Sequence, residues 1–113
     1  MSQHYFETNY KDFPITVILG WDRPMQHVFL VIRKPPELVD ETLQVLDENF
    51  LYSNLYEKDP FGHDLDYYRE VLRHFQISVP ESMFNEVEHD AVRNVGNRFV
   101  KHGADGSLTE LSS

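Results

Sequence analysis

Acidic and histidine side chains recur at helical spacing in the middle of the chain, a pattern that could bind a divalent cation or carry out acid–base chemistry. Asp66, Glu70 and His74 follow one another at intervals of four residues, and His63 lies just before them. On a helix this spacing puts two carboxylates and an imidazole on one face. The same spacing is common on solvated helix faces laced by ion pairs, and we favour that plainer interpretation.

A second acidic cluster, Glu86, Glu88 and Asp90, follows in the next helical segment. Glu86 and Asp90 are like charges four residues apart, which costs a few tenths of a kcal/mol unless a cation or a partner neutralises them. A solvated face again explains the pattern. If the acidic residues bind a partner, however, these three, together with Glu70 and Glu81, are the candidates.

The segment between two predicted strands carries the other candidate partner-binding residues, Trp21 and Arg23. Tryptophan and arginine are over-represented among the residues that dominate protein interfaces. The alternative, which we favour, is that the indole folds back and packs on the sheet.

Several classes of site are absent from the sequence. The chain has no cysteine, so thiolate catalysis, disulfides and cysteine-bound metals are excluded. It has no glycine-rich phosphate loop, no nucleophile elbow and no zinc-binding HExxH helix. The six histidines are dispersed, with no short paired spacing. We therefore expect no catalytic residues, no resident metal and no cofactor.

Charge is distributed unevenly along the chain. Residues 37–90 hold fourteen acidic residues against three strong bases, a local charge of −11 within a total of −9, while each flanking segment has a charge of +1. A central acidic block predicts a basic protein or protein assembly as the partner and argues against direct binding of nucleic acid. In a sharper form of this hypothesis, the carboxylates imitate the phosphates of DNA or RNA.

Length and composition predict one folded domain. The chain has 113 residues, of which 41% are hydrophobic and 13% aromatic, which is enough to build a core. We expect a domain over residues 1–102 and a flexible tail over residues 103–113. No apolar run approaches the length of a membrane span and the first residues do not resemble a signal peptide, so a cytoplasmic location is expected.

Periodicity predicts an α+β fold, with an antiparallel sheet of about four strands packed against two or three helices. Residues 15–19 and 27–32 are rich in β-branched and aromatic side chains and predict a hairpin. Residues 5–10 could add an edge strand, and residues 49–56 and 97–102 predict two further strands. Both faces of the hairpin are apolar, which suits helices on one face and a partner or a second copy on the other, and equally suits helices on both faces.

Three helices are expected. The first, over residues 36–47, is the least clearly marked. The second, over residues 64–75, begins with Asp64 as a cap. The third, over residues 80–95, has capping-box spacing between Ser78 and Glu81, and Gly96 is placed to end it.

Three short stretches resemble segments of small acidic proteins encoded on bacterial plasmids and integrated mobile elements. They are Gly20-Trp21-Asp22-Arg23-Pro24, Leu51-Tyr52-Ser53-Asn54-Leu55 and Val95-Gly96-Asn97-Arg98. The resemblance spans most of the chain from Phe13 to His102. It implies an accessory role, in maintenance of the element or in evasion of host defence, and it carries no catalytic residue.

The sequence thus leads to one preferred hypothesis, a small non-catalytic binding module with an acidic surface. Two alternatives stay open. One is a metal-dependent enzyme or metal-binding protein that uses the histidine and carboxylate helix face. The other is a homodimeric structural protein whose apolar hairpin meets its copy across a twofold axis.

Overall fold

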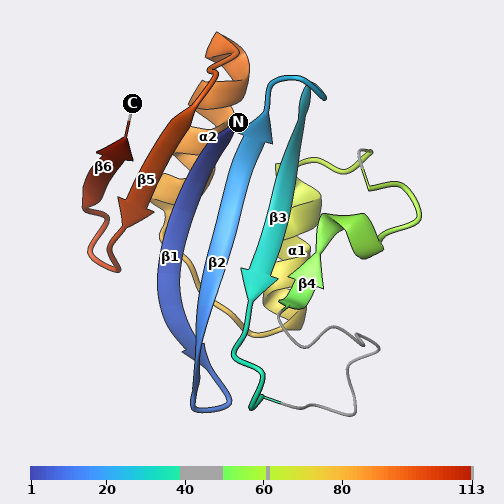
Figure 1. The fold of residues 1–113 in the computed structure, drawn as a ribbon, viewed down its shortest axis with the longest axis vertical. Coiled ribbons are helices and arrows are strands. Elements are labelled where there is room, and N and C mark those ends of the chain that lie inside the picture. The colour runs from blue at the N-terminus through green and yellow to red at the C-terminus, as the bar shows by residue number, and fades with distance from the viewer. Residues whose placement is uncertain (39–49, 61, 113) are drawn as a thin grey trace.

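One mixed sheet organises the molecule. The computed structural model describes residues 1–38, 50–60 and 62–112, and in them six strands lie in the order β4-β3-β2-β1-β5-β6 (Figure 1). The strands are β1 (Ser2–Tyr10), β2 (Phe13–Asp22), β3 (His27–Arg33), β4 (Phe50–Ser53), β5 (Arg98–His102) and β6 (Leu108–Ser112). The α+β class is as predicted, but the sheet is larger than the expected four strands and is not wholly antiparallel.

Tight turns set the register of the first three strands. Lys11 and Asp12 both have positive φ, the backbone conformation that suits a two-residue hairpin loop between β1 and β2. The next loop ends at Gln26, also at positive φ, and returns the chain as β3. The predicted hairpin of β2 and β3 is therefore confirmed, with each strand longer than expected.

Strand β1 lies inside the sheet, so the expectation of an edge strand is wrong. It pairs antiparallel with β2 and parallel with β5, where Ser2 lies opposite Arg98 and His4 opposite Val100. A parallel neighbour requires a long crossover connection, and residues 11–97 provide it. Local sequence patterns do not reveal such a distant partner.

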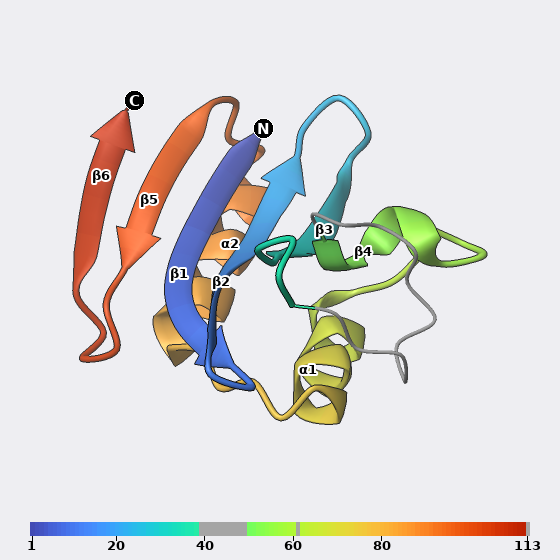
Figure 2. The ribbon, with the colours of Figure 1, turned by 60° about the horizontal axis from the view of Figure 1, so that its bottom comes forward.

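Both described α-helices, α1 (Leu65–His74) and α2 (Glu81–Arg93), lie on the same face of the sheet (Figure 2). The Asp64 side chain caps α1 by accepting a hydrogen bond from Tyr67 N at 2.9 Å, as predicted. Helix α2 does not use the predicted capping box, since Pro80 is its N-cap without a side-chain bond. Asn94, at φ 51°, ends the helix before Gly96, because asparagine also tolerates the left-handed conformation.

The core fills the space between the helices and the sheet face that they cover. Its completely buried residues alternate along the strands and meet one stripe of each helix. They are Val17, Leu19, Leu30, Ile32, Leu51, Tyr68, Met83 and Val87. In the described part of the chain, no helix has the length and apolar character required to cross a membrane.

Two other predicted segments differ from expectation. The strand predicted over residues 49–56 is shorter, because β4 ends at Ser53 and a 3-10 turn, Asn54–Tyr56, follows. The tail expected to be flexible instead contributes β6, which pairs with β5 and covers its outer edge. Most of the helix predicted over residues 36–47 lies outside the described residues.

Candidate functional site

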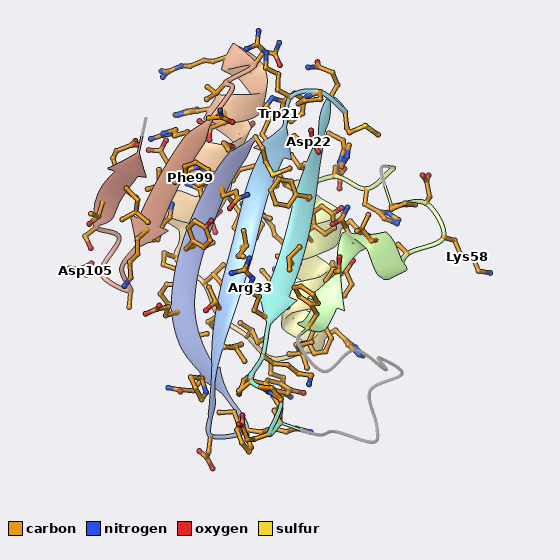
Figure 3. The ribbon with its side chains drawn as sticks, in the orientation of Figure 1. Trp21, Asp22, Arg33, Lys58, Phe99 and Asp105 are labelled. Carbon is orange, nitrogen blue, oxygen red and sulfur yellow. The ribbon has the colours of Figure 1, made fainter. Side chains whose placement is uncertain are left out.

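The second face of the sheet, which we call the open face, is not covered by any described helix. In Figure 3 it points toward the viewer, with Phe99, Arg33 and Asp22 labelled on it. Strand register arranges its centre in two rows that run across the strands. The first row is Val31, Ile18, Tyr5 and Lys101, and the second row is Phe29, Gly20, Gln3 and Phe99.

The open face is uneven, with two shallow hollows. One, of about 290 Å³, lies over β2, β3 and β4, and exposed Leu55 of the 3-10 turn stands at its rim. The other, of about 560 Å³, lies over β1 and β5, where its lining includes Tyr5, Arg33, Phe99 and Lys101. Both combine apolar or aromatic walls with a few charges, as binding surfaces commonly do.

The Phe29 ring lies against Gly20, the only glycine of β2. A Cβ atom at Gly20 would overlap the Phe29 ring and the carbonyl oxygen of Ser2. Because the ring occupies this place, Phe29 is almost buried although it is on the uncovered face. An aromatic side chain that covers a neighbouring strand glycine pins the register of the two strands.

Both signs of charge occur on the open face. Lys101 Nζ lies 3.4 Å from a Glu7 carboxylate oxygen across β5 and β1. Arg33 is exposed and makes no ion pair with the other described residues. Asp22 lies at the opposite end of the β2–β3 pair and accepts a hydrogen bond from Met25 N at 3.2 Å.

On the opposite side of the molecule, acidic groups of both helices gather around one cation. We call Asp66, Glu81, Glu88 and the central Arg69 the helix patch. Arg69 donates two hydrogen bonds to Glu81, and its Nε lies 3.9 Å from Asp66. The bonds to Glu81, followed by the charges of Glu81, Asp66 and Glu88, outweigh burial and raise the pKa of Arg69. The Arg69 guanidinium thus bonds to Glu81, lies near Asp66 and is within electrostatic reach of Glu88.

Other predicted partner-binding acids are neutralised within the molecule. Glu70 is exposed but pairs with Arg73 on the same helix. Glu86 and Asp90 both pair with Arg98 of β5, at 3.1 and 2.8 Å. Asp90 is only 1% exposed, so its expected place on an outward acidic surface is wrong. The like-charge spacing of Glu86 and Asp90 is explained by a shared arginine from a distant strand.

The two candidates from the hairpin separate in space. Trp21 is 8% exposed and faces the helices, where its indole N–H donates to Asn94 Oδ1 at 3.3 Å. The indole therefore packs against the rest of the protein, as the favoured interpretation of the sequence predicted. Arg23 remains exposed in the turn after β2.

A chain of buried polar side chains links β1, α2 and β5. Ser82 Oγ lies 2.9 Å from His102 Nδ1, His102 Nε2 lies 2.8 Å from His4 Nδ1, and His4 Nε2 lies 2.7 Å from Asp90 Oδ2. The hydrogen bonds can run in one direction, in which the Ser82 hydroxyl donates to His102, His102 to His4 and His4 to the Asp90 carboxylate. Chemically this is a proton path that starts at a half-buried hydroxyl. The hollows on the open face do not include Ser82 or His102.

Burial and neighbouring charges set the protonation of this network. Burial, and then the charge of His4, lower the pKa of His102 to about 4. Burial alone would raise the pKa of Asp90, but hydrogen bonds from His4, Arg98 and Ser2 outweigh it and lower that pKa. Burial alone would likewise lower the pKa of Arg98, but the carboxylates of Glu110, Asp90 and Glu86 raise it. The network therefore favours a neutral His102 beside an ionised Asp90–Arg98 pair.

The histidine and carboxylate face proposed for metal binding is not assembled in the structure. The Asp66 side chain is 93% exposed, and the His63 ring stacks on Tyr67 with centroids 3.7 Å apart. Among residues 1–38, 50–60 and 62–112, no group of three or more His, Cys, Asp or Glu side chains could hold a metal ion.

A third hollow, of about 330 Å³, lies beside α1 and contains a carboxylate that two phenols share. Glu57 accepts hydrogen bonds from Tyr52 Oη at 3.1 Å and Tyr67 Oη at 2.9 Å. Burial, and then Glu57, raise the pKa of both tyrosines, and burial with the charge of Glu57 raises that of Tyr68 to about 12. The phenols stay protonated and fix the carboxylate in place.

Sequence reasoning missed the open-face rows and the buried polar chain, because both unite residues that are far apart in the chain. The alternation of side chains along β3 places Val31 on the opposite face of the sheet from Leu30 and Ile32. This alternation was the signal for the open face that the sequence contained. No spacing pattern connects His4 with residues 82, 90 and 102.

Comparison of the chain with protein-family models, with curated proteins and with solved structures found no match. The resemblance to proteins of plasmids and mobile elements stays a prediction.

Proposed function

We propose that the protein is a non-catalytic binding module whose helix patch recognises a basic protein surface. The observation that carries the proposal is the gathering of three carboxylates, from two helices, around the single cation Arg69. The net charge of −9 gives the whole molecule the same sign as the patch. Charge of one sign steers a basic partner toward the molecule and accelerates encounter.

The centre of the helix patch, Arg69 with Glu81, is held in one arrangement before a partner arrives. The Arg69 guanidinium stacks on the buried ring of Phe84 at 4.0 Å and binds both oxygens of Glu81. These contacts join α1 to α2. Asp66 and Glu88 lie at the surface around this fixed centre, and their oxygens can accept charge-assisted hydrogen bonds from lysine or arginine. A fixed surface loses less side-chain entropy on binding than a mobile one.

Affinity purification from the native host, at low and high salt, tests the proposal. We expect the wild-type protein to retain basic proteins at low salt and to release them as salt screens the charges. The variant Asp66→Lys, Glu88→Lys should lose this retention. The matched control, Glu37→Lys with Asp105→Lys, makes the same change of charge at exposed positions outside the helix patch. This control should keep most of the retention of basic proteins.

Two results would count against the proposal. If both double variants lose the same proteins to the same extent, net charge and not the helix patch is responsible. If the retained proteins are acidic or neutral, or if retention ignores salt, the partner chemistry is wrong.

The sharper form of the proposal is that the helix patch occupies a nucleic-acid-binding groove, because such grooves are lined with lysine and arginine placed for negative charge. In that case, double-stranded DNA or RNA should displace the retained protein at the same ionic strength. Retention that withstands an excess of both nucleic acids would refute this form while leaving the broader proposal intact.

A further inference from the structure

We propose that the open face of the sheet is occupied by a second copy of this chain, so that the protein is a twofold-symmetric dimer with its sheets face to face. This inference does not depend on the helix patch, which lies on the opposite side of the molecule. Three features support it: the size of the face, the self-complementary order of its rows, and the position of its charges.

The open face is large enough for a specific interface. With strands about 4.8 Å apart and residues about 3.3 Å apart, six strands that average about seven residues cover about 24 by 23 Å. Two such faces bury at least about 1,100 Å², above the roughly 1,000 Å² expected of a biological contact. Val31, Tyr5 and Phe99 are half-buried there, and Leu111 at the edge is 55% exposed.

The two rows fit each other when one copy is rotated. A twofold axis that runs across the strands, midway between the rows, places the first row of each copy over the second row of the other. Near that axis Ile18, which is 4% exposed, and the half-buried Val31 then lie over the Phe29 ring that covers Gly20 of the other copy. Apolar side chains of the first row thus meet the aromatic ring of the second row, as in the inner faces of packed sheets.

Charges at the ends of β2 and β3 are also self-complementary. In the register of β2 and β3, Arg33 lies opposite Thr16 at one end of the two strands and Asp22 lies opposite His27 at the other. Each of these two positions is three residue steps from the axis. The same rotation brings Arg33 of each copy to the end where Asp22 of the other copy lies. The contact between Arg33 and Asp22 therefore occurs twice in the dimer. Lys101 of the first row likewise approaches Phe99 of the second copy, a cation–π arrangement.

The alternative twofold axis, parallel to the strands, is less favourable. It keeps each row at its own level, so Arg33 stays far from Asp22 and at the end where Glu7 lies. Glu7 is already paired with Lys101 of its own copy, whereas Asp22 forms no ion pair with the other described residues. The charge pattern therefore selects the axis that runs across the strands, because opposite charges at the rim fix the register of an interface. In that dimer both helix layers point outward and each helix patch stays accessible.

Sedimentation equilibrium of the full chain, with charge-reversal variants, tests the inference. The wild-type protein should dimerise. Arg33→Glu places like charges together twice, and should raise the dimer dissociation constant by at least about tenfold. Asp22→Lys should do the same. The double variant Arg33→Glu, Asp22→Lys restores the pairing with its signs exchanged and should recover most of the affinity.

The control Arg93→Glu makes the same charge change at an exposed position on α2 and should leave dimerisation unchanged. Circular dichroism verifies that each variant folds. A wild-type protein that stays monomeric at high micromolar concentration would overturn the inference, and so would a double variant no tighter than either single variant.

The outcome is distinguishable from that of the proposed function. The Asp66→Lys, Glu88→Lys variant changes the helix patch and should dimerise like the wild type. A monomeric protein that still retains basic proteins through the helix patch would refute the dimer alone. A dimer without that retention would refute the proposed function alone.

Discussion

At the scale of single residues, the structure explains why several carboxylates could be recognised from the sequence but not correctly placed. Asp90 and Glu86 look like a repulsive pair on one helix, and only the tertiary fold brings Arg98 between them. Asp90 also anchors His4, which in turn orders His102. Helical spacing predicts which residues share a face, whereas burial of that face depends on strands elsewhere in the chain.

The buried His102 predicts a loss of stability in mild acid. The pKa of His102 is about 4 in the folded protein, below the ordinary histidine pKa of 6.5. Between these two pH values the unfolded chain therefore takes up a proton that the folded chain does not bind. The stabilisation is complete above about pH 6.5 and is lost as the pH falls toward 4, by about 3 kcal/mol in total. The groups that face His102 are His4 from β1, Ser82 and Glu86 from α2, and Arg98 from its own strand.

Urea unfolding from about pH 7 to about pH 4 measures this effect. His102→Gln should be less stable than the wild type at neutral pH but should lose less stability on acidification, because the titrating group is gone. His89→Gln, a change at an exposed histidine of α2, should follow the wild-type pH profile. Parallel pH profiles for the wild type and His102→Gln would contradict the assignment.

At the scale of elements, the sequence predicts what depends on local pattern. Alternation marks β2 and β3, and the stripe behind the Asp64 cap marks α1, because their side chains face one packed layer. The position of a strand within the sheet depends on long-range pairing, so β1 was expected at an edge and β6 was not expected at all. Helix α2 ends at Asn94 and not at the predicted Gly96, because asparagine as well as glycine accepts positive φ.

The contact between Gly20 and Phe29 predicts that Gly20→Ala destabilises the sheet. A methyl group there must displace the Phe29 ring and press on the Ser2 carbonyl, and overpacking of this kind costs about 1–3 kcal/mol. The free energy of unfolding from urea titration measures the loss. Thr16→Ala, on the same face of the same strand, should cost less than about 1 kcal/mol. Equal costs for both variants would show that the ring does not fill this place.

At the scale of the whole molecule, an excess of negative charge opposes compaction. The ion pairs of Arg69, Arg73 and Arg98 offset part of the repulsion, and the remainder acts across the surface. The sequence alone established the sign and size of this charge. It could not show which carboxylates would be neutralised, because Arg98 meets its partners only when β5 joins the sheet.

Salt should therefore stabilise the fold. Raising NaCl from about 10 mM to about 150 mM shortens the screening length from about 30 Å to about 8 Å, which weakens repulsion between distant like charges. We expect the thermal midpoint to rise by a few degrees at fixed protein concentration. The Glu37→Lys, Asp105→Lys variant, whose net charge is −5 instead of −9, should show a smaller rise. A midpoint that falls with salt would mean that attractive ion pairs dominate.

The parallel pairing of β1 with β5 has a consequence for biosynthesis. Strand β1 leaves the ribosome well before its second neighbour, Arg98–His102. One border of the growing sheet therefore keeps unpaired backbone groups until residues 98–102 have been made. Because this pairing closes a loop of nearly the full chain, it is a slow step of high contact order. Nascent chains stalled before residue 98 should thus be the species most in need of a chaperone.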